Sequence, residues 1–300
     1  MLRSAVVTNC TSKKRFAAAP RQMARTMERS DVRGLSRDWC SRRMDEGAVA
    51  ARDLYQGRSF KIAERSAEQA GASLFAVSAG YGLISADDLI PPYSVTVSGD
   101  SEDNVLTMAG GAKASAWWEA LEPLTSTIAN LAEFDLVMLA LPAAYLLMIE
   151  SELESLRHTM RGTLLIFACP GSAQQLRPEL AANVMPYGNS LESSGSPIRG
   201  TGADAAQRRL FHFTSNLAPA LGAEFSLSEA RQAVEGFAQA LLAPARQPGR
   251  SVSDSDVLDL ISRLRADGVT SWTAALRNLR SVRGIACSQA RFQALFQSVQ

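Results

Sequence analysis

Four short apolar runs, separated by stretches with helical spacing, constrain the fold of this 300-residue chain most strongly. Apolar residues fill them without regular polar alternation, which is typical of strands covered on both faces. The predicted strands are Ala5–Thr8, Leu74–Ser78, Phe134–Leu141 and Thr163–Ala168. Strands that alternate with helices predict an α/β domain with a four-stranded parallel sheet flanked by helices.

The segments between and after these strands contain the predicted helices of the first part of the chain. The first of them ends at Gly71, because glycine is the usual residue after the last helical turn. The predicted helices are Val49–Gly71, Ala112–Leu131, Ala144–Arg157, Gln174–Asn183, Ala205–Leu221 and Ser228–Leu242.

The composition changes near residue 244, where Pro, Gly, Arg and Ser without periodicity predict a linker over Pro244–Asp254. Residues 246–300 contain eight Arg, four Asp and no Lys or Glu, a net charge of +4. The preceding residues carry 23 basic and 26 acidic side chains, a net charge of −3. We therefore predict an α/β domain over residues 1–243, with an insertion at about 15–48, and a basic helical module over residues 244–300.

The module contains three short predicted helices: Val257–Ala266, Trp272–Leu279 and Ser288–Val299. Three helices in so short a segment suit a DNA-binding module of the helix-turn-helix kind. They suit a helical cap on the main domain equally well. The positive charge favours nucleic acid as a partner.

The cysteines and the hydropathy pattern exclude several classes of protein. The four cysteines are scattered without a CxxC pair, so we expect no zinc site built on cysteine pairs. No run of 18 apolar residues and no apolar leader segment occurs, so we expect a cytoplasmic protein without a membrane contact. We expect no cofactor and no metal, because glycine-rich nucleotide motifs are absent and the chain has only two histidines.

Polar or turn-forming residues follow all four predicted strands. The chain has only four lysines, and two of them, Lys13 and Lys14, lie side by side after the first strand. The carboxyl ends of parallel strands meet at one edge of a sheet, where ligands bind in open α/β folds. Hydroxyls, small residues and two ammonium groups at that edge suit an anionic ligand with a planar ring. The four segments are Asn9–Lys14, Ser78–Gly82, Pro142–Tyr145 and Cys169–Ser172.

Each of these residues also has an ordinary structural interpretation. A Lys-Lys pair is usually a solvated surface, and Gly80-Tyr81-Gly82 is usually a turn. Asp87 and Asp88 suit a cap or a turn, Ser172 suits a helix N-cap, and the cysteines suit buried positions. Only their joint placement at strand ends favours a functional site.

Four motifs resemble a bacterial and phage family of unknown function. They are Cys10-Thr-Ser-Lys-Lys14, Ala51-Arg-Asp-Leu-Tyr-Gln-Gly-Arg-Ser-Phe60, Val77-Ser-Ala-Gly-Tyr-Gly-Leu-Ile84 and Ile90-Pro-Pro-Tyr93. The family pattern is C-S-K-K-K, L-Y-x-G-x-x-F, S-A-K-Y-G-L and P-Y, and the resemblance covers about residues 5–200. The chain departs from it at Gly80, where the family has Lys, and in the long insertion.

This family resembles the core domain of archaeosine synthase, and both are similar to the uracil-DNA-glycosylase fold. The exit of the fourth strand, Cys169–Leu176, is similar in position to the Pro-Ser loop that glycosylases press into the DNA minor groove. One member of this general class removes glucosylated hydroxymethylcytosine from phage DNA. The resemblance implies a DNA glycosylase that flips a modified base out of double-stranded phage DNA, in anti-phage defence.

Such an enzyme needs an anion or a positioned water near the sugar and donors on the departing base. We expect Asp87 or Asp88 to supply the carboxylate, Lys13 to act on the base or flanking phosphates, and Tyr81 or Tyr93 to stack on the base. Glu192 and Asp204 are alternative carboxylates, and a lysine nucleophile stays open. The expected substrate-binding residues are Asn9, Cys10, Ser12, Lys14, Tyr55, Arg58, Ser78, Tyr93 and Ser172.

Two other functions stay open. The likeness to archaeosine synthase implies a transferase or lyase that acts on a deazaguanine base, in tRNA or as the free nucleobase. A non-enzymatic DNA-binding protein is the third hypothesis, in which the C-terminal helices carry the function.

Overall fold

Two bodies with separate hydrophobic cores make up the chain, residues Met1–Leu242 and Ala243–Gln300. The computed structural model describes residues 2–43, 47–192, 196, 198–222, 224–241 and 250–298. Most of the predicted linker, Pro244–Asp254, lies outside the described residues.

A mostly parallel sheet of five strands lies at the centre of the first body, in the order β4-β3-β1-β6-β7. The expected strands are present, with bounds that differ by one or two residues. The prediction of four strands is corrected by a fifth, because the chain reverses at Gly80–Gly82 and β4 pairs antiparallel with β3. The strands are β1 (Ser4–Asn9), β3 (Ser73–Ser78), β4 (Gly82–Ser85), β6 (Leu136–Ala140) and β7 (Thr163–Phe167).

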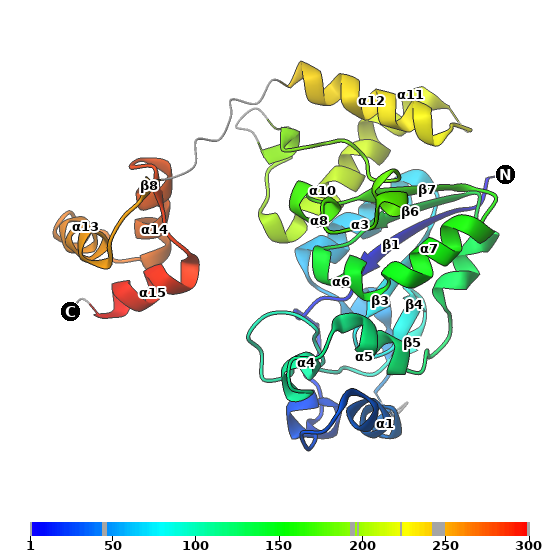
Figure 1. Ribbon diagram of the computed structural model, residues 1–300, viewed down its shortest axis with the longest axis horizontal. Helices are drawn as coiled ribbons and strands as arrows, with labels where there is room; N and C mark the ends of the chain where they lie inside the picture. Colours follow the sequence, from blue (N-terminus) through cyan, green and yellow to red (C-terminus); the bar gives the residue numbers. More distant parts are fainter. Residues whose placement is uncertain are drawn as a thin grey trace. The chain divides into compact units, whose positions relative to one another are not determined.

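Helices cover both faces of this sheet. From the centre, the chain moves from β1 to β3 through α3 (Arg58–Ala70) and, in the opposite direction, from β6 to β7 through α7 (Glu150–Thr159). Right-handed crossovers in opposite directions place their helices on opposite faces. Figure 1 shows this arrangement, with α10 (Ala205–His212) beside α3 and α6 (Ala143–Met148) on the side of α7. The strand order therefore reverses between β1 and β6.

Several predicted helices are interrupted. The stretch 112–131 forms only α5 (Ala114–Ala120) and the 3₁₀ segment η3 (Ile128–Glu133), with Pro123 between them. Proline lacks a backbone N–H and restricts the preceding residue, so the helix does not continue through it. Gly71 ends α3 in the left-handed conformation with a φ of 58°, which confirms the predicted cap.

The remaining elements of the first body are short, apart from α12. They are α2 (Ala51–Leu54), α4 (Val105–Met108), α8 (Pro170–Ala173), α9 (Pro178–Ala181), η4 (Ser190–Glu192), η5 (Gly202–Asp204), the π-helical η6 (Phe213–Leu217), α11 (Ala218–Leu221), α12 (Leu227–Ala240) and the paired strands β2 (Val49–Ala50) and β5 (Leu89–Ile90).

The predicted insertion is an ordered part of the first body where it is described. It forms η1 (Pro20–Gln22), η2 (Ala24–Thr26) and α1 (Val32–Arg42). Asp31 caps α1 by accepting a hydrogen bond from the Gly34 amide at 2.7 Å. Trp39 is fully buried and donates from Nε1 to the Gly80 carbonyl at 2.6 Å, which ties the insertion to the turn between β3 and β4.

The second body contains a small helical core. Its helices are α13 (Asp254–Ala266), α14 (Trp272–Ser281) and α15 (Gln289–Ser298). A parallel pair of two-residue strands, β8 (Arg250–Ser251) and β9 (Ile285–Ala286), joins the segment before α13 to the segment before α15. A capping box between Ser253 and Asp256 starts α13. In the described part of the chain, no helix has the length and apolarity needed to span a membrane.

Candidate functional site

A cavity of about 540 Å³ lies at the carboxyl ends of β1 and β6. This is the point at which the strand order reverses, and open α/β sheets bind their ligands there. Its volume is within the range of small-molecule sites. The walls come from the segment after β1, the start of α3, the loop 94–101 and the start of α6. The lining residues are Asn9, Cys10, Thr11, Ser12, Lys13, Lys14, Gly57, Ser59, Ser94, Val95, Thr96, Ser98, Gly99, Asp100, Ser101, Pro142, Tyr145 and Ala203.

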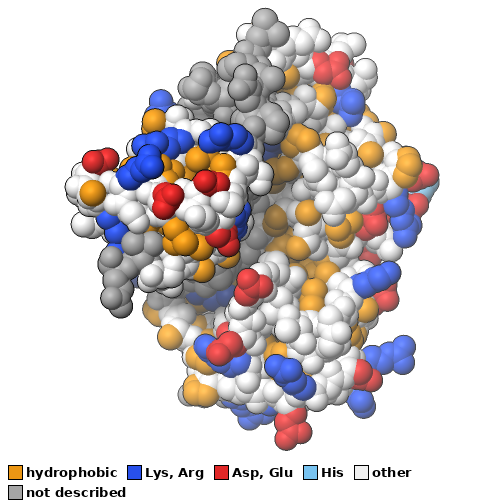
Figure 2. Space-filling view, turned by 60° about the vertical axis from the view of Figure 1, so that its left-hand side comes forward, with side chains coloured by type: hydrophobic (Ala, Val, Ile, Leu, Met, Phe, Trp, Pro, Cys, Tyr) orange, Lys and Arg blue, Asp and Glu red, His pale blue; other side chains and the backbone are white. Residues whose placement is uncertain are grey.

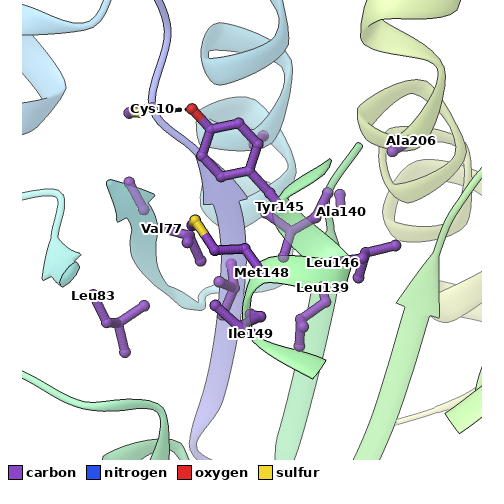
Figure 3. Close-up of a cluster of buried hydrophobic side chains, with 14 of the residues drawn as sticks. Cys10, Val77, Leu83, Leu139, Ala140, Tyr145, Leu146, Met148, Ile149 and Ala206 are labelled. Carbon is purple, nitrogen blue, oxygen red and sulfur yellow. Dashed lines mark hydrogen bonds between the residues drawn. The ribbon is translucent and has the colours of Figure 1, made fainter. Parts of the chain in front are cut away.

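A thiol and a phenol meet at the base of this cavity. The Cys10 Sγ lies 3.2 Å from the Tyr145 Oη, and Figure 3 shows this contact above the buried side chains of Val77 and Met148. The Cys10 amide donates to the Val77 carbonyl at 3.0 Å and so extends the pairing of β1 with β3. Burial raises the pKa of Tyr145, so the phenol stays protonated and can donate a hydrogen bond.

Lys14 supplies a positive charge without a carboxylate beside it. Its Nζ lies 4.1 Å from the centroid of the Tyr93 ring and 5.8 Å from that of Tyr55, a cation–π arrangement. No carboxylate of the described residues lies within 4 Å of this Nζ. Burial lowers the pKa of the ammonium, while Cys10 and Asp103 act in the opposite direction. An anionic ligand would meet a cation that is already partly stripped of water.

Lys13 and Ser12 are exposed at the mouth of the cavity, beside the first turn of α3. Gly57 precedes this turn, and a Cβ there would lie 2.5 Å from the Thr11 side chain, so the close approach requires glycine. The N-terminal amides of a helix favour negative charge. This wall therefore suits a phosphate.

The tyrosines expected to stack on a base are buried. Tyr93 and Tyr81 are each 1% exposed. The Tyr93 Oη lies 2.8 Å from the Tyr55 Oη and 2.7 Å from the Ser78 Oγ, and burial raises the pKa of both phenols. The Tyr81 Oη donates to the Gln22 Oε1 at 3.2 Å. These residues support the floor of the site, and the expectation that Tyr81 or Tyr93 stacks on a base is wrong.

Asp87 and Asp88 lie at the opposite edge of the sheet from the two lysines. Antiparallel β4 returns the chain to the start of β3, where the amide after Ser85 donates to the Leu74 carbonyl. Asp87 is exposed and pairs with Arg52 at 2.8 Å, and Asp88 accepts from the Ser85 amide at 2.8 Å. The expectation that they share a site with Lys13 is therefore wrong, because β4 reverses the chain before them.

Glu192 and Asp204 are bound into a buried ionic cluster. Asp204 pairs with Arg208 at 3.0 Å, and Glu192 pairs with both Arg208 and Arg209 at 3.2 and 3.0 Å. The two arginines are only 2% and 1% exposed. Because these carboxylates balance buried charge, they are not free to act on a substrate.

Two further predicted site residues differ from expectation. Arg58, at the start of α3, pairs with Asp204 at 3.0 Å and donates to the Arg199 carbonyl. It lies close to the cavity without lining it. Ser172 is buried in the short helix α8 and also does not line the cavity. The N-cap of α8 is Cys169, so the alternative expectation that Ser172 caps this helix is wrong as well.

Gln207 orients Asn9, and none of the sequence motifs predicts this role. Its Nε2 donates to the Asn9 Oδ1 at 3.1 Å and to the Ala140 carbonyl at 2.7 Å. The Asn9 Nδ2 in turn donates to the Cys10 carbonyl at 2.7 Å. Gln207 lies almost 200 residues away from Asn9, and a single buried glutamine on a predicted helix carries no signal for such a contact.

Asp100 is also a new candidate. Among the described residues that line the cavity, it alone carries a carboxylate, and it is exposed on the loop before α4. The sequence indicates only a polar, turn-rich segment there. In the described ranges, no group of three or more His, Cys, Asp or Glu side chains is placed to hold a metal ion.

Part of the chain is similar to a known protein family. Residues 39–165 match the model of a family described as a family of unknown function (DUF6884). This segment supplies three walls of the cavity, from α3, the loop 94–101 and α6, whereas the wall with Lys13 and Lys14 lies before it. No curated protein and no solved structure matches the chain.

Proposed function

We propose that the protein is a DNA glycosylase-like enzyme that cleaves the N-glycosidic bond of a modified base in phage DNA, in anti-phage defence. The α/β body would then be a variant of the uracil-DNA-glycosylase fold with a fifth, antiparallel edge strand. The resemblance of the Cys10–Lys14 and Ser78–Leu83 motifs supports the proposal, as does the position of the cavity at the carboxyl edge of the parallel strands.

The observation that carries the proposal is the presence of opposite charges on two walls of one cavity. Lys13 and Lys14 lie on the wall after β1, and Asp100 lies on the loop 94–101. Phosphates that flank a flipped nucleotide need cations, and the sugar needs an anion or a positioned water when its bond to the base breaks. The cavity offers both, at a volume that suits a single nucleoside.

The reaction follows from this arrangement. The bond between C1′ and the base nitrogen breaks, and its electron pair leaves with the base. Lys14 donates a hydrogen bond to the base and so offsets the negative charge that develops there. A water adds to C1′ and gives a proton to Asp100, which leaves an abasic sugar and the base as an anion. The base then takes up a proton, and Asp100 returns to its charged form. The base needs no stacking tyrosine in this scheme.

The test is an assay for abasic sites on unmodified, hydroxymethylated and glucosylated phage DNA. We expect abasic sites on one of the modified DNAs, and a loss of about 10²-fold or more in Asp100→Asn. Asp87→Asn is the matched control, because it removes the same charge at the opposite edge of the sheet. If the unaltered protein leaves all three DNAs intact, the proposal is refuted. If Asp100→Asn and Asp87→Asn are equally active, the role of Asp100 is refuted.

Cys10 favours a second candidate, a transferase or lyase that acts on a deazaguanine base. A thiol at the base of the cavity is a nucleophile that glycosidic hydrolysis does not require. Under the first proposal, Cys10→Ser keeps most of the formation of abasic sites. The transferase or lyase is supported if the unaltered protein forms no abasic sites but exchanges a base, and if Cys10→Ser loses that exchange. DNA binding without either reaction leaves the non-enzymatic function.

A further inference from the structure

The charges of the second body are separated along its chain. All of its carboxylates lie at or before residue 267, and no Asp or Glu follows. Helices α14 and α15 and the turn between them carry only positive charge. The four acidic residues are Asp254, Asp256, Asp259 and Asp267, and the four arginines that follow them are Arg277, Arg280, Arg283 and Arg291.

Two of these arginines have partners within the body. Arg291 pairs with Asp254 at 2.6 Å, and Arg280 donates to the Cys287 carbonyl at 2.6 Å. For Arg277 and Arg283, by contrast, no carboxylate of residues 250–298 or of the other described ranges lies within 4 Å. Both side chains are exposed, so their charge faces solvent.

Helix α14 and the strand pair β8–β9 hold arginines at the surface of this body. The helix buries Ala275, Leu276 and Leu279, which leaves Arg277 and Arg280 on the exposed part of its surface. The pairing of β8 with β9 adds a further cation, because the Arg250 amide donates to the Gly284 carbonyl at 2.7 Å, next to Arg283. We call Arg250, Arg277, Arg280 and Arg283 the arginine face. Figure 2 shows one side of this body, on which both basic and acidic side chains border an apolar area.

We propose that the arginine face binds the phosphate backbone of duplex DNA without reading its sequence. Arginine binds phosphate with paired N–H donors, and its guanidinium is always charged at neutral pH. Arg277, Arg280 and Arg283, which have no carboxylate of the described residues within 4 Å, complement a row of phosphates, whereas the charge of Arg250 also acts on Asp256. The hydroxyl of Ser281 adds a neutral donor to the exposed surface. This binding does not depend on the proposed glycosidic reaction.

The test measures the affinity of the full chain for a short labelled DNA duplex at several salt concentrations. Each phosphate contact contributes about −0.9 to the slope of log K against log salt. We therefore expect Arg277→Gln and Arg283→Gln each to weaken binding and to reduce the slope by about 1. Arg263→Gln is the matched control, since it removes one exposed arginine from α13, the helix with three carboxylates.

Three results overturn the proposal. The first is an unaltered protein that does not bind the duplex. The second is an equal change of slope in Arg263→Gln, which would show an effect of net charge and not of this face. The third is unchanged DNA binding in Arg277→Gln and Arg283→Gln while binding to anionic lipid vesicles is lost. Activity on modified DNA is measured separately, so a failure of the proposed reaction does not affect this outcome.

Discussion

At the scale of single residues, Lys14 is the described residue whose surroundings best suit an anionic ligand in the cavity. Its ammonium packs on an aromatic ring, and no carboxylate of the described residues lies within 4 Å of it, although the charge of Asp103 acts on it from farther away. Removal from water lowers the pKa of this group, because burial makes the charged form less stable. A bound anion would stabilise the charged form again. The sequence indicates the importance of the lysine pair, but it does not distinguish exposed Lys13 from half-buried Lys14.

Lys14→Met tests this difference. The substitution keeps the aliphatic chain on Tyr93 and removes the charge, so we expect the fold to persist. We also expect formation of abasic sites to fall by about 10²-fold or more. Lys113→Met, at an exposed position before α5, is the control. Equal loss in both variants would contradict a specific role of Lys14.

Trapping with borohydride decides whether Lys14 acts as a nucleophile. An amine with a lowered pKa is more often neutral, so it attacks an aldehyde more readily. A covalent adduct with abasic DNA that is absent in Lys14→Met would assign the Schiff base to this residue. If no adduct forms with the unaltered protein, Lys14 acts through its charge alone.

His212 links the stability of the first body to pH. It is buried, its Nδ1 lies 2.9 Å from the Tyr187 Oη, and burial lowers its pKa from 6.5 to about 4. The unfolded chain therefore binds more protons between these values, and the free energy of unfolding falls as the pH decreases from about 6.5 to 4. The loss is at most about 3 kcal/mol.

Denaturant unfolding at several pH values measures this effect. We expect His212→Gln to flatten the profile in that range, at a lower overall stability. His158→Gln, an exposed position on α7, should leave the profile as it is. A flat profile in the unaltered protein would show that the buried imidazole does not control acid stability.

At the scale of the elements, the strands could be predicted well and the site only partly. Continuous apolar runs are sufficient to locate buried strands, and residues that follow β1 and β6 form the cavity. The prediction that Asp87 and Asp88 belong to the site is wrong, because the strand β4 turns the chain back before them. This strand is only four residues long, and nothing in its sequence indicates that it pairs antiparallel with β3. A buried glutamine and an exposed aspartate on a loop give no signal without the tertiary fold.

The insertion explains the departure at Gly80. A Cβ at this position would lie 3.0 Å from the Tyr93 ring and 3.1 Å from Trp39, so the indole of α1 occupies the space that a side chain would need. Arg43, directly after α1, donates to the Gly80 carbonyl at 3.0 Å and lies 5.3 Å from the Tyr81 ring. The insertion thus brings a cation to the place where the resembling family has lysine.

Gly80→Ala should destabilise the first body by about 1–3 kcal/mol, because the aromatic cluster cannot shift without strain. Gly236→Ala is the control, since its Cβ meets no atom within 4 Å inside α12, and it should stabilise the protein by about 0.5–1 kcal/mol. Thermal unfolding compares the two. If Trp39→Phe does not reduce the loss in Gly80→Ala, the space is limited by other side chains.

At the scale of the whole molecule, the two cores predict two unfolding transitions. Phe292 is fully buried in the second core, and its replacement by alanine should cost about 3–5 kcal/mol, enough to unfold a body of this size. Calorimetry of Phe292→Ala should show the transition of the first body unchanged and that of the second body lost. Gln297→Ala, exposed on α15, should keep both. Loss of both transitions in Phe292→Ala would show that the bodies fold as one.

The contact between Lys14 and Tyr93 also gives the molecule an optical signal. A bound anion would draw the ammonium away from the ring, which changes the near-ultraviolet absorption of a tyrosine that is otherwise shielded from water. The centroid of the Trp39 ring lies 6.2 Å from that of Tyr93, close enough to receive excitation energy from it. We therefore expect occupancy of the cavity to change the intrinsic fluorescence of Trp39, and Trp39→Phe should remove that change.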